Sequence, residues 1–223
     1  MEPLRITHFS DVLCVWAYVT QVRMDKLVEE FGSEVAIDYR YVSVFGFARD
    51  KLEERWRGKG GLAAYGEHVA GVVGQFEHVP FHRDLWSRVV PISSMPAHLL
   101  LCAVRLLERE GRAAPGSQRD AAWHVRQACF RDARDISDQA VLVQIAGELG
   151  LDVEAIAAHL AAGRAHAELA RDADLTREQD IRVSPTVILN EGRQRMSGNV
   201  GYRVLVANVR EVLKRPAMEA SWC

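Results

Sequence analysis

The first forty residues alternate between strand-like and helix-like patterns of apolar and polar positions. Residues 4–9 alternate apolar with polar side chains, which predicts a strand. From Val12 onward apolar residues follow a helical spacing as far as Phe31, and Gly32 ends the predicted helix. Residues 35–42 are mostly β-branched or aromatic and predict a second strand. The chain therefore opens on a β-α-β unit.

The middle of the chain, residues 50–180, contains no strand pattern. Asp138 and Asp152 are predicted to cap two of its helices, and Thr176 with Gln179 has the spacing of a capping box. Apolar residues repeat with helical spacing over 97–109, 119–131, 137–149 and 153–162. This stretch is therefore predicted to be an all-helical block.

Strand patterns return after residue 183. Residues 186–189 and 194–197 predict two strands with a turn at 190–192. A final helix is predicted on the apolar face formed by Val204, Leu205, Val209 and Leu213. The order β-α-β, helical block, β-β-α predicts an α/β fold in which both ends of the chain share one sheet.

Composition and charge exclude several classes of protein. The 223 residues are 48% hydrophobic and 26% charged, with a formal net charge of −2, so the chain is an ordinary globular one with no basic field for nucleic acid. No apolar run approaches the roughly 20 residues that span a bilayer. The first residues have no leader pattern. We therefore expect a cytoplasmic protein without nucleic-acid or membrane partners.

The cysteines lie too far apart in sequence to form a recognisable framework. Cys14, Cys102, Cys129 and Cys223 are expected to be free thiols, with Cys102 and Cys129 buried in the helical block and Cys223 in the tail. His98 and Cys102 are four residues apart on a predicted helix, but no second pair has a suitable spacing for zinc. No metal site is predicted.

Cys14 stands where the first strand has ended and the first helix begins. At that place a sulfur faces unpaired backbone N–H groups and the positive end of the helix dipole, both of which stabilise a thiolate. The position therefore predicts a surface-accessible, activated thiolate, with Trp16 beside it as an apolar wall. A small buried apolar side chain is the alternative role of Cys14.

A proline directly precedes the third predicted strand, in the run Val183-Ser184-Pro185-Thr186. Proline cannot donate a ladder hydrogen bond and is confined to edges and starts of strands. A cis peptide bond between Ser184 and Pro185 would account for it. That geometry would leave the Ser184 backbone free to pair with an extended substrate beside Cys14.

The two motifs and the order of elements resemble the thioredoxin superfamily, and specifically its DsbA branch with an inserted helical domain. Phe9-Ser-Asp-Val-Leu-Cys14-Val-Trp16 is similar to the active-site opening of FrnE-like members. Residues 130–138 and 197–202 resemble two further signatures of the branch. The resemblance implies a thioredoxin fold with an inserted all-helical domain.

The resemblance also implies domain bounds and site residues. The thioredoxin-like domain would comprise 1–49 and 181–215, the inserted domain 50–180, and the tail 216–223. Cys14 would be the catalytic residue. The implied substrate-binding residues are Trp16, Ala17, Ser184, Pro185, Thr186, Gly198 and Asn199. Substrate is expected between the thioredoxin face and the inserted helices, near Trp16 and either Phe45 or Phe47.

The sequence departs from the DsbA pattern at Ala17. Members that oxidise or isomerise disulfides use C-x-x-C, whereas this chain has C-x-x-A, so no disulfide can form within the motif. Monothiol exchange is left: Cys14 attacks a disulfide or a glutathione adduct, and an external thiol resolves it. We expect an oxidoreductase of small thiols and disulfides without a tightly bound cofactor, with glutathione as candidate co-substrate.

Two other hypotheses stay open. The chain is more distantly similar to kappa-class glutathione transferases and hydroxychromene-carboxylate isomerases, which implies a glutathione-dependent isomerase or transferase of a small aromatic substrate. Those proteins carry an Asp-Arg pair where this chain has Val200 and Gly201, and they favour serine where it has Cys14. The helix start after Gly198 could still accept a carboxylate. The other hypothesis is a redox-inactive binding module, and a homodimer is an open alternative for assembly.

Overall fold

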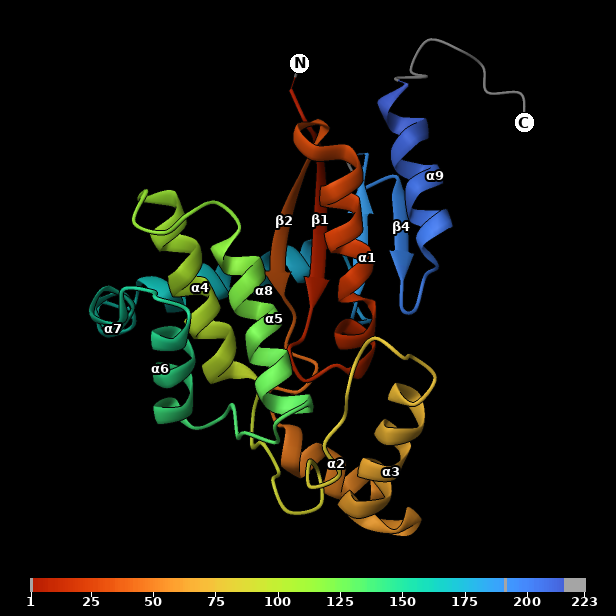
Figure 1. Ribbon diagram of the computed structural model, residues 1–223, viewed down its shortest axis with the longest axis vertical. Helices are drawn as coiled ribbons and strands as arrows, with labels where there is room; N and C mark the ends of the chain where they lie inside the picture. The colour runs from red at the N-terminus through yellow and green to blue at the C-terminus, as the bar shows by residue number, and fades with distance from the viewer. Residues whose placement is uncertain (1, 191, 215–223) are drawn as a thin grey trace.

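The computed structural model describes residues 2–190 and 192–214, and Figure 1 shows one sheet between groups of helices. The strands lie in the order β2-β1-β3-β4. Their bounds are β1 (Leu4–Ser10), β2 (Val35–Tyr41), β3 (Thr186–Leu189) and β4 (Gln194–Ser197). β1 is parallel to β2, and β3 is antiparallel to both β1 and β4. The prediction that both ends of the chain share one sheet is confirmed.

Helices α1 (Val15–Phe31) and α9 (Tyr202–Leu213) pack on the sheet, and the other helices lie between β2 and β3 in sequence. Those helices are α2 (Ala48–Trp56), η2 (Arg57–Lys59), α3 (Gly61–Val73), α4 (Met95–Arg109), α5 (Ser117–Phe130), α6 (Gln139–Glu148), α7 (Val153–Ala161) and α8 (Arg164–Glu178). A single turn, η1 (Gly32–Glu34), joins α1 to β2. In Figure 1, α4 to α7 lie beyond the β2 edge, while α2 and α3 lie below the carboxyl ends of β1 and β2.

The predicted helix caps have mixed outcomes. The Asp138 carboxylate accepts the N–H of Ala140 at 2.8 Å, and that of Asp152 accepts the N–H of Ala155 at 2.9 Å, so both caps are confirmed. The capping box at Thr176 is wrong, because Thr176 lies inside α8. Its hydroxyl donates to the Asp172 carbonyl oxygen one turn earlier, at 2.7 Å, so the side chain is hydrogen-bonded without capping a helix.

Helix α1 belongs to two hydrophobic clusters. Its first half, including Tyr18 and Val19, packs into a large cluster with the inserted helices. Its second half, including Met24 and Leu27, packs with α9 and one face of the sheet. The start of α1 therefore lies at the junction between the sheet and the inserted helices, and burial on both sides fixes its position.

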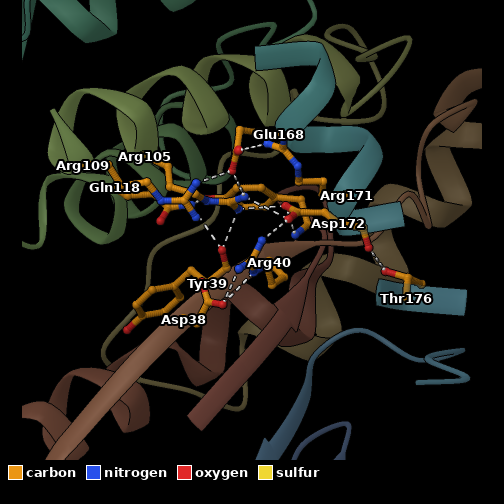
Figure 2. A network of polar contacts seen from close by, with 11 residues as sticks. Asp38, Tyr39, Arg40, Arg105, Arg109, Gln118, Glu168, Arg171, Asp172 and Thr176 are labelled. Atoms are coloured by element: carbon orange, nitrogen blue, oxygen red, sulfur yellow. Dashed lines mark hydrogen bonds and ion pairs between the residues drawn. The ribbon is translucent and has the colours of Figure 1, made fainter. Parts of the chain in front are cut away.

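A buried ion cluster joins the inserted helices to the edge of the sheet (Figure 2). The Arg105 guanidinium of α4 donates to both carboxylate oxygens of Asp172 on α8, at 2.9 and 2.8 Å, and to the Tyr39 carbonyl of β2 at 2.7 Å. Arg40 of β2 donates to the same carboxylate at 2.9 Å. Since Asp172 is fully buried, each arginine partner offsets the cost of removing its charge from water.

The predictions for the other cysteines hold where the structure describes them. Cys102 on α4 and Cys129 on α5 are free and fully buried. The predictions for Cys223 and the tail 216–223 lie outside the described residues. None of the described helices is long and apolar enough to cross a membrane.

Candidate active site

Cys14 is the N-cap residue of α1, at the end of a tight turn that follows β1. Its N–H donates to the carbonyl oxygen of Asp11 at 3.1 Å. Its thiol donates to the carbonyl oxygen of Ser184, with Sγ at 3.2 Å. The Ser184–Pro185 peptide bond is cis. The structure thus brings together two motifs that are 170 residues apart in sequence.

The Cys14 side chain is only 6% exposed, so the expectation of a surface-accessible thiolate is corrected. Burial raises the pKa of the Cys14 thiol above its ordinary value, and the nearby carboxylate of Asp11 raises it further. The Ser184 hydroxyl and the backbone N–H groups of Ala17 and Trp16 favour the thiolate. Burial outweighs them because a charged sulfur loses more hydration there than these donors restore.

The carboxylate of Asp11 joins three segments around the Cys14 turn. It accepts the N–H of Leu13 at 2.9 Å, the N–H of Phe45 at 2.8 Å and the hydroxyl of Ser94 at 2.9 Å. Asp11 and Ser94 are fully buried. The carboxylate therefore fixes the turn, the loop after β2 and the start of α4 relative to one another.

His98 of α4 forms a hydrogen bond with the same turn. Its Nε2 accepts the N–H of Val12 at 3.2 Å, so this nitrogen is unprotonated and the neutral ring carries its hydrogen on Nδ1. Burial lowers the pKa of His98, which keeps the ring neutral. The ring stacks on Tyr41 with centroids 5.0 Å apart. His98 is thus a packed structural residue, and no three His, Cys, Asp or Glu side chains gather into a metal site within the described chain.

The loop before β3 presents backbone next to the Cys14 sulfur. The Thr186 hydroxyl donates to the carbonyl oxygen of Val183 at 2.8 Å, which closes the loop around Pro185. The N–H of Ser184 has no hydrogen-bond partner among residues 2–190 and 192–214. Val183 is 47% exposed. An extended segment could therefore pair with the backbone here without displacing an existing bond.

A cleft of about 410 Å³ opens beside Cys14, between the start of α1 and the helices α2 and α3. Aromatic side chains form much of its wall, namely Trp16, Phe45, Trp56 and Tyr65. Phe47 is not among its lining residues and is 79% exposed. The cleft has the size and apolar character of a small-molecule site.

The remaining residues implied by the resemblance lie elsewhere. Ala17 is buried in the core, and its side chain does not line the cleft. Gly198 donates its N–H to the Pro185 carbonyl at 2.8 Å, and Asn199 accepts a hydrogen bond from Arg23 at 2.7 Å. Gly198 lines a separate cavity of about 20 Å³, which is roughly the volume that a single water occupies. Since α9 begins at Tyr202, neither Gly198 nor Asn199 is part of that helix.

The fold described above agrees with the family to which comparison with known proteins assigns the chain. A family model described as DSBA-like thioredoxin domain matches residues 5–210. The chain belongs to this DSBA-like family. Family membership supports a thiol–disulfide oxidoreductase-like function, and the resemblance noted in the sequence is confirmed at the level of family and fold.

Individual proteins that are similar to this DSBA-like chain carry names that describe different activities. The ClpXP adapter protein SpxH of Shouchella clausii is 24% identical over 95% of this chain and 68% of its own length. The cytosolic disulfide reductase DsbM of Pseudomonas aeruginosa, also solved with GSH, is 18% identical, with a TM-score of 0.68 over 94% of this chain and 100% of that chain. A 2-hydroxychromene-2-carboxylate isomerase is 15% identical, with a TM-score of 0.64 over 98% and 100% of the two chains. The two structural matches support the fold alone.

Sequence reasoning did not assign several residues of this site. Asp11 lies within the motif that marks Cys14, yet nothing local indicates that its carboxylate binds Phe45 and Ser94. Tyr65 and His98 come from the helical block and reach the site only through the fold. The helical spacing of Lys51, Arg55 and Lys59 is a signal that the sequence does contain.

Proposed function

We propose that this DSBA-like protein catalyses thiol–disulfide exchange on small thiols and disulfides, with Cys14 as its single reacting thiol. The observation that carries the proposal is the placement of the Cys14 sulfur, 3.2 Å from the Ser184 carbonyl and on the wall of the 410 Å³ cleft. The unpaired N–H of Ser184 lies in the same loop. A substrate in the cleft would therefore meet the nucleophile. Ser184 itself does not line the cleft, so its N–H would serve a substrate that extends past the Cys14 sulfur.

The reaction has two balanced steps. The Cys14 thiolate attacks one sulfur of a disulfide or of a glutathione adduct, so that a new S–S bond to Cys14 forms, the old S–S bond breaks and the other sulfur leaves as a thiolate. A second small thiol, such as glutathione, then attacks the mixed disulfide as its thiolate. The product is a new disulfide, and the Cys14 thiolate is regenerated. No oxidant is needed, because one disulfide is consumed for each one formed.

Deprotonation of Cys14 precedes the attack, because the thiolate is the nucleophile. Burial and Asp11 raise the pKa of Cys14, so only a small fraction is thiolate at neutral pH. Ala17 cannot supply a resolving thiol within the motif. The mixed disulfide must then persist until an external thiol enters, and the second step depends on the concentration of that thiol.

The test uses a small peptide carrying glutathione in a mixed disulfide, with reduced glutathione as the second thiol. Wild-type protein is expected to accelerate formation of oxidised glutathione and to show a glutathione adduct in its intact mass. Cys14→Ser should lose both signals. Cys129→Ala, which removes a fully buried thiol, is the matched control and should keep both. A wild-type rate in Cys14→Ser would overturn the proposal.

A second variant tests the single-thiol mechanism itself. Ala17→Cys places another thiol about one helical turn from Cys14. The trapped glutathione adduct should then disappear, because the new thiol resolves it internally and leaves an intramolecular disulfide. If the adduct keeps its wild-type lifetime, the thiol introduced at position 17 does not attack the mixed disulfide at Cys14. A redox-inactive binding module predicts instead that Cys14→Ser leaves the native function intact, while Ala17→Cys gains disulfide reductase activity.

The aromatic wall of the cleft favours one further candidate, a glutathione-dependent isomerase or transferase. Trp16, Phe45 and Trp56 could stack on a small aromatic substrate beside a bound thiol. This candidate requires glutathione to bind without being consumed. Calorimetry of Cys14→Ser with millimolar glutathione distinguishes the two, because absence of binding excludes the isomerase or transferase and leaves the exchange reaction untouched.

A further inference from the structure

A row of basic side chains lines the cleft beside Cys14. Lys51 and Arg55 on α2, and Lys59 on η2, are spaced four residues apart and face the cleft together. His68 of α3 lies in the same wall, and none of the lining residues is acidic. None of the three cations forms an ion pair within the described residues. None of the three positive charges is therefore paired with a carboxylate among the described residues of the cleft.

The three cations differ in how freely they can move. The Lys51 ammonium donates to the Val44 carbonyl at 2.6 Å and lies 5.6 Å from the centre of the Phe45 ring, so it is anchored. Arg55 and Lys59 are exposed. Lys59 lies over the Trp56 ring at 5.6 Å. Arg55 and Lys59 can therefore adjust to a ligand that enters the mouth of the cleft.

Tyr65 gives a second, independent sign of a ligand. Its side chain is 7% exposed and lines the cleft, yet its hydroxyl has no hydrogen-bond partner among the described residues. The centre of its ring lies 5.4 Å from that of Trp56 and 5.1 Å from that of Trp86. Burial, together with the charges of Cys14 and Asp11, raises the pKa of Tyr65, so the hydroxyl is a neutral donor at physiological pH.

We infer that the cleft selects small thiols and disulfides that carry a carboxylate. The carboxylate would pair with Arg55 and Lys59 at the mouth, and a polar atom closer to the reacting sulfur would accept the Tyr65 hydroxyl hydrogen. The aromatic wall would cover the aliphatic part of the ligand. The inference rests on the proposed function for its chemistry, but the binding of the anion does not require Cys14 to react.

The test compares three disulfides of similar length that differ in charge: 3,3′-dithiodipropionate (anionic), bis(2-hydroxyethyl) disulfide (neutral) and cystamine (cationic). Each is mixed with wild-type protein at low ionic strength, and formation of the Cys14 mixed disulfide is followed by intact mass. The anionic probe should react fastest and cystamine slowest. Added salt should shrink the difference, since it screens exposed charges. Equal rates for the three probes at low salt would overturn the inference.

Substitutions identify the charges responsible. Arg55→Gln and Lys59→Gln should each slow the anionic probe by about two- to fivefold, the usual range for one exposed ion pair, and leave the neutral probe unchanged. Arg57→Gln is the matched control, because Arg57 lies between them on the chain but does not line the cleft. An equal effect of Arg57→Gln on the anionic probe would show that only the overall charge matters, and would also overturn the inference.

A binding measurement separates this inference from the proposed function. In Cys14→Ser, 3,3′-dithiodipropionate should quench tryptophan fluorescence, because Trp16 and Trp56 line the cleft, and Arg55→Gln should weaken that binding. Binding to Cys14→Ser without any reaction in the wild type would remove the exchange function and keep the anion site. Reaction of the wild type at equal rates with all three disulfides, together with no binding to Cys14→Ser, would keep the exchange function and remove the anion site.

Discussion

Asp11 has two opposed effects on the protein, and Asp11→Asn separates them. The carboxylate accepts hydrogen bonds from Leu13, Phe45 and Ser94, and at the same time it raises the pKa of the Cys14 thiol. Asparagine has nearly the same size but no charge. The variant should therefore be less stable than the wild type while its Cys14 becomes more reactive at neutral pH.

The loss of stability can be worked from the hydrogen bonds. Asparagine keeps one oxygen, which suits the two donors Phe45 and Ser94, and turns its amide group toward the Leu13 N–H. One charge-assisted hydrogen bond is lost and a buried donor is left unpaired, at a cost of about 2–3 kcal/mol. For a chain of this length that lowers the melting temperature by roughly 4–12 °C.

The gain in reactivity comes from a lower pKa of the Cys14 thiol. Removing the negative charge of Asp11 lowers the pKa of Cys14, so the variant has more thiolate at pH 7. The assay is the rate of reaction with a neutral disulfide as a function of pH, together with urea unfolding. Asp50→Asn, at an exposed position on α2, is the control for both measurements. A pH–rate profile for Asp11→Asn that is unmoved or displaced upward would refute the reasoning.

Three other ionisable groups are buried, namely Cys14, Asp172 and His8. Because the pKa of Cys14 is raised above its ordinary value of about 8.5, the wild-type rate of attack on a neutral disulfide should still be rising as the pH goes from 7 to 8.5, and a plateau near pH 7 would contradict this. Asp172→Ala leaves the Arg105 charge buried without its partner (Figure 2) and should cost about 3–5 kcal/mol in urea unfolding, whereas a loss below about 1 kcal/mol would mean that the cluster is not coupled to the fold. Burial and the charge of Arg126 lower the pKa of His8 to about 3, whereas in the unfolded chain it is about 6.5, so the unfolded state binds a proton that the native state refuses and stability falls as the pH drops below about 6.5. At pH 5 the loss is about 2 kcal/mol, and it should vanish in His8→Phe when the two are compared by urea unfolding at pH 7 and 5.

The parts of the fold that the sequence predicts well are those whose pattern is contiguous. The strands at 4–9 and 186–189 show their burial in their own residues, and the observed β1 and β3 coincide with them to within a residue. The sequence pattern does not predict α2, α3 and α8 as separate helices. In α2 only Ala48 and Leu52 are buried, so its apolar stripe is too narrow to be distinguished from a loop, and packing stabilises it only once the chain has folded.

The same distinction applies to the candidate site. Cys14 and Ser184–Pro185 could be found because each motif is recognised from its immediate neighbours in sequence. The surroundings of Cys14 could not be predicted, since its sulfur lies against the Ser184 carbonyl, 170 residues away. The turn before it is held by Ser94 and His98, which are 83 and 86 residues away from the residues they bind. No local pattern encodes a contact over that separation.

The raised pKa of Cys14 changes where selectivity would arise under the proposed function. A buried thiol is ionised less often, but the nucleophilicity of a thiolate increases with its pKa, so each ionised Cys14 is the more effective attacker. The rate then depends strongly on how well a ligand is held beside the sulfur. Because Ala17 cannot resolve the mixed disulfide, the incoming second thiol must reach Cys14 through the same cleft. A preference of Arg55 and Lys59 for carboxylates would therefore act on both half-reactions, once on the disulfide that enters and once on the thiol that releases it.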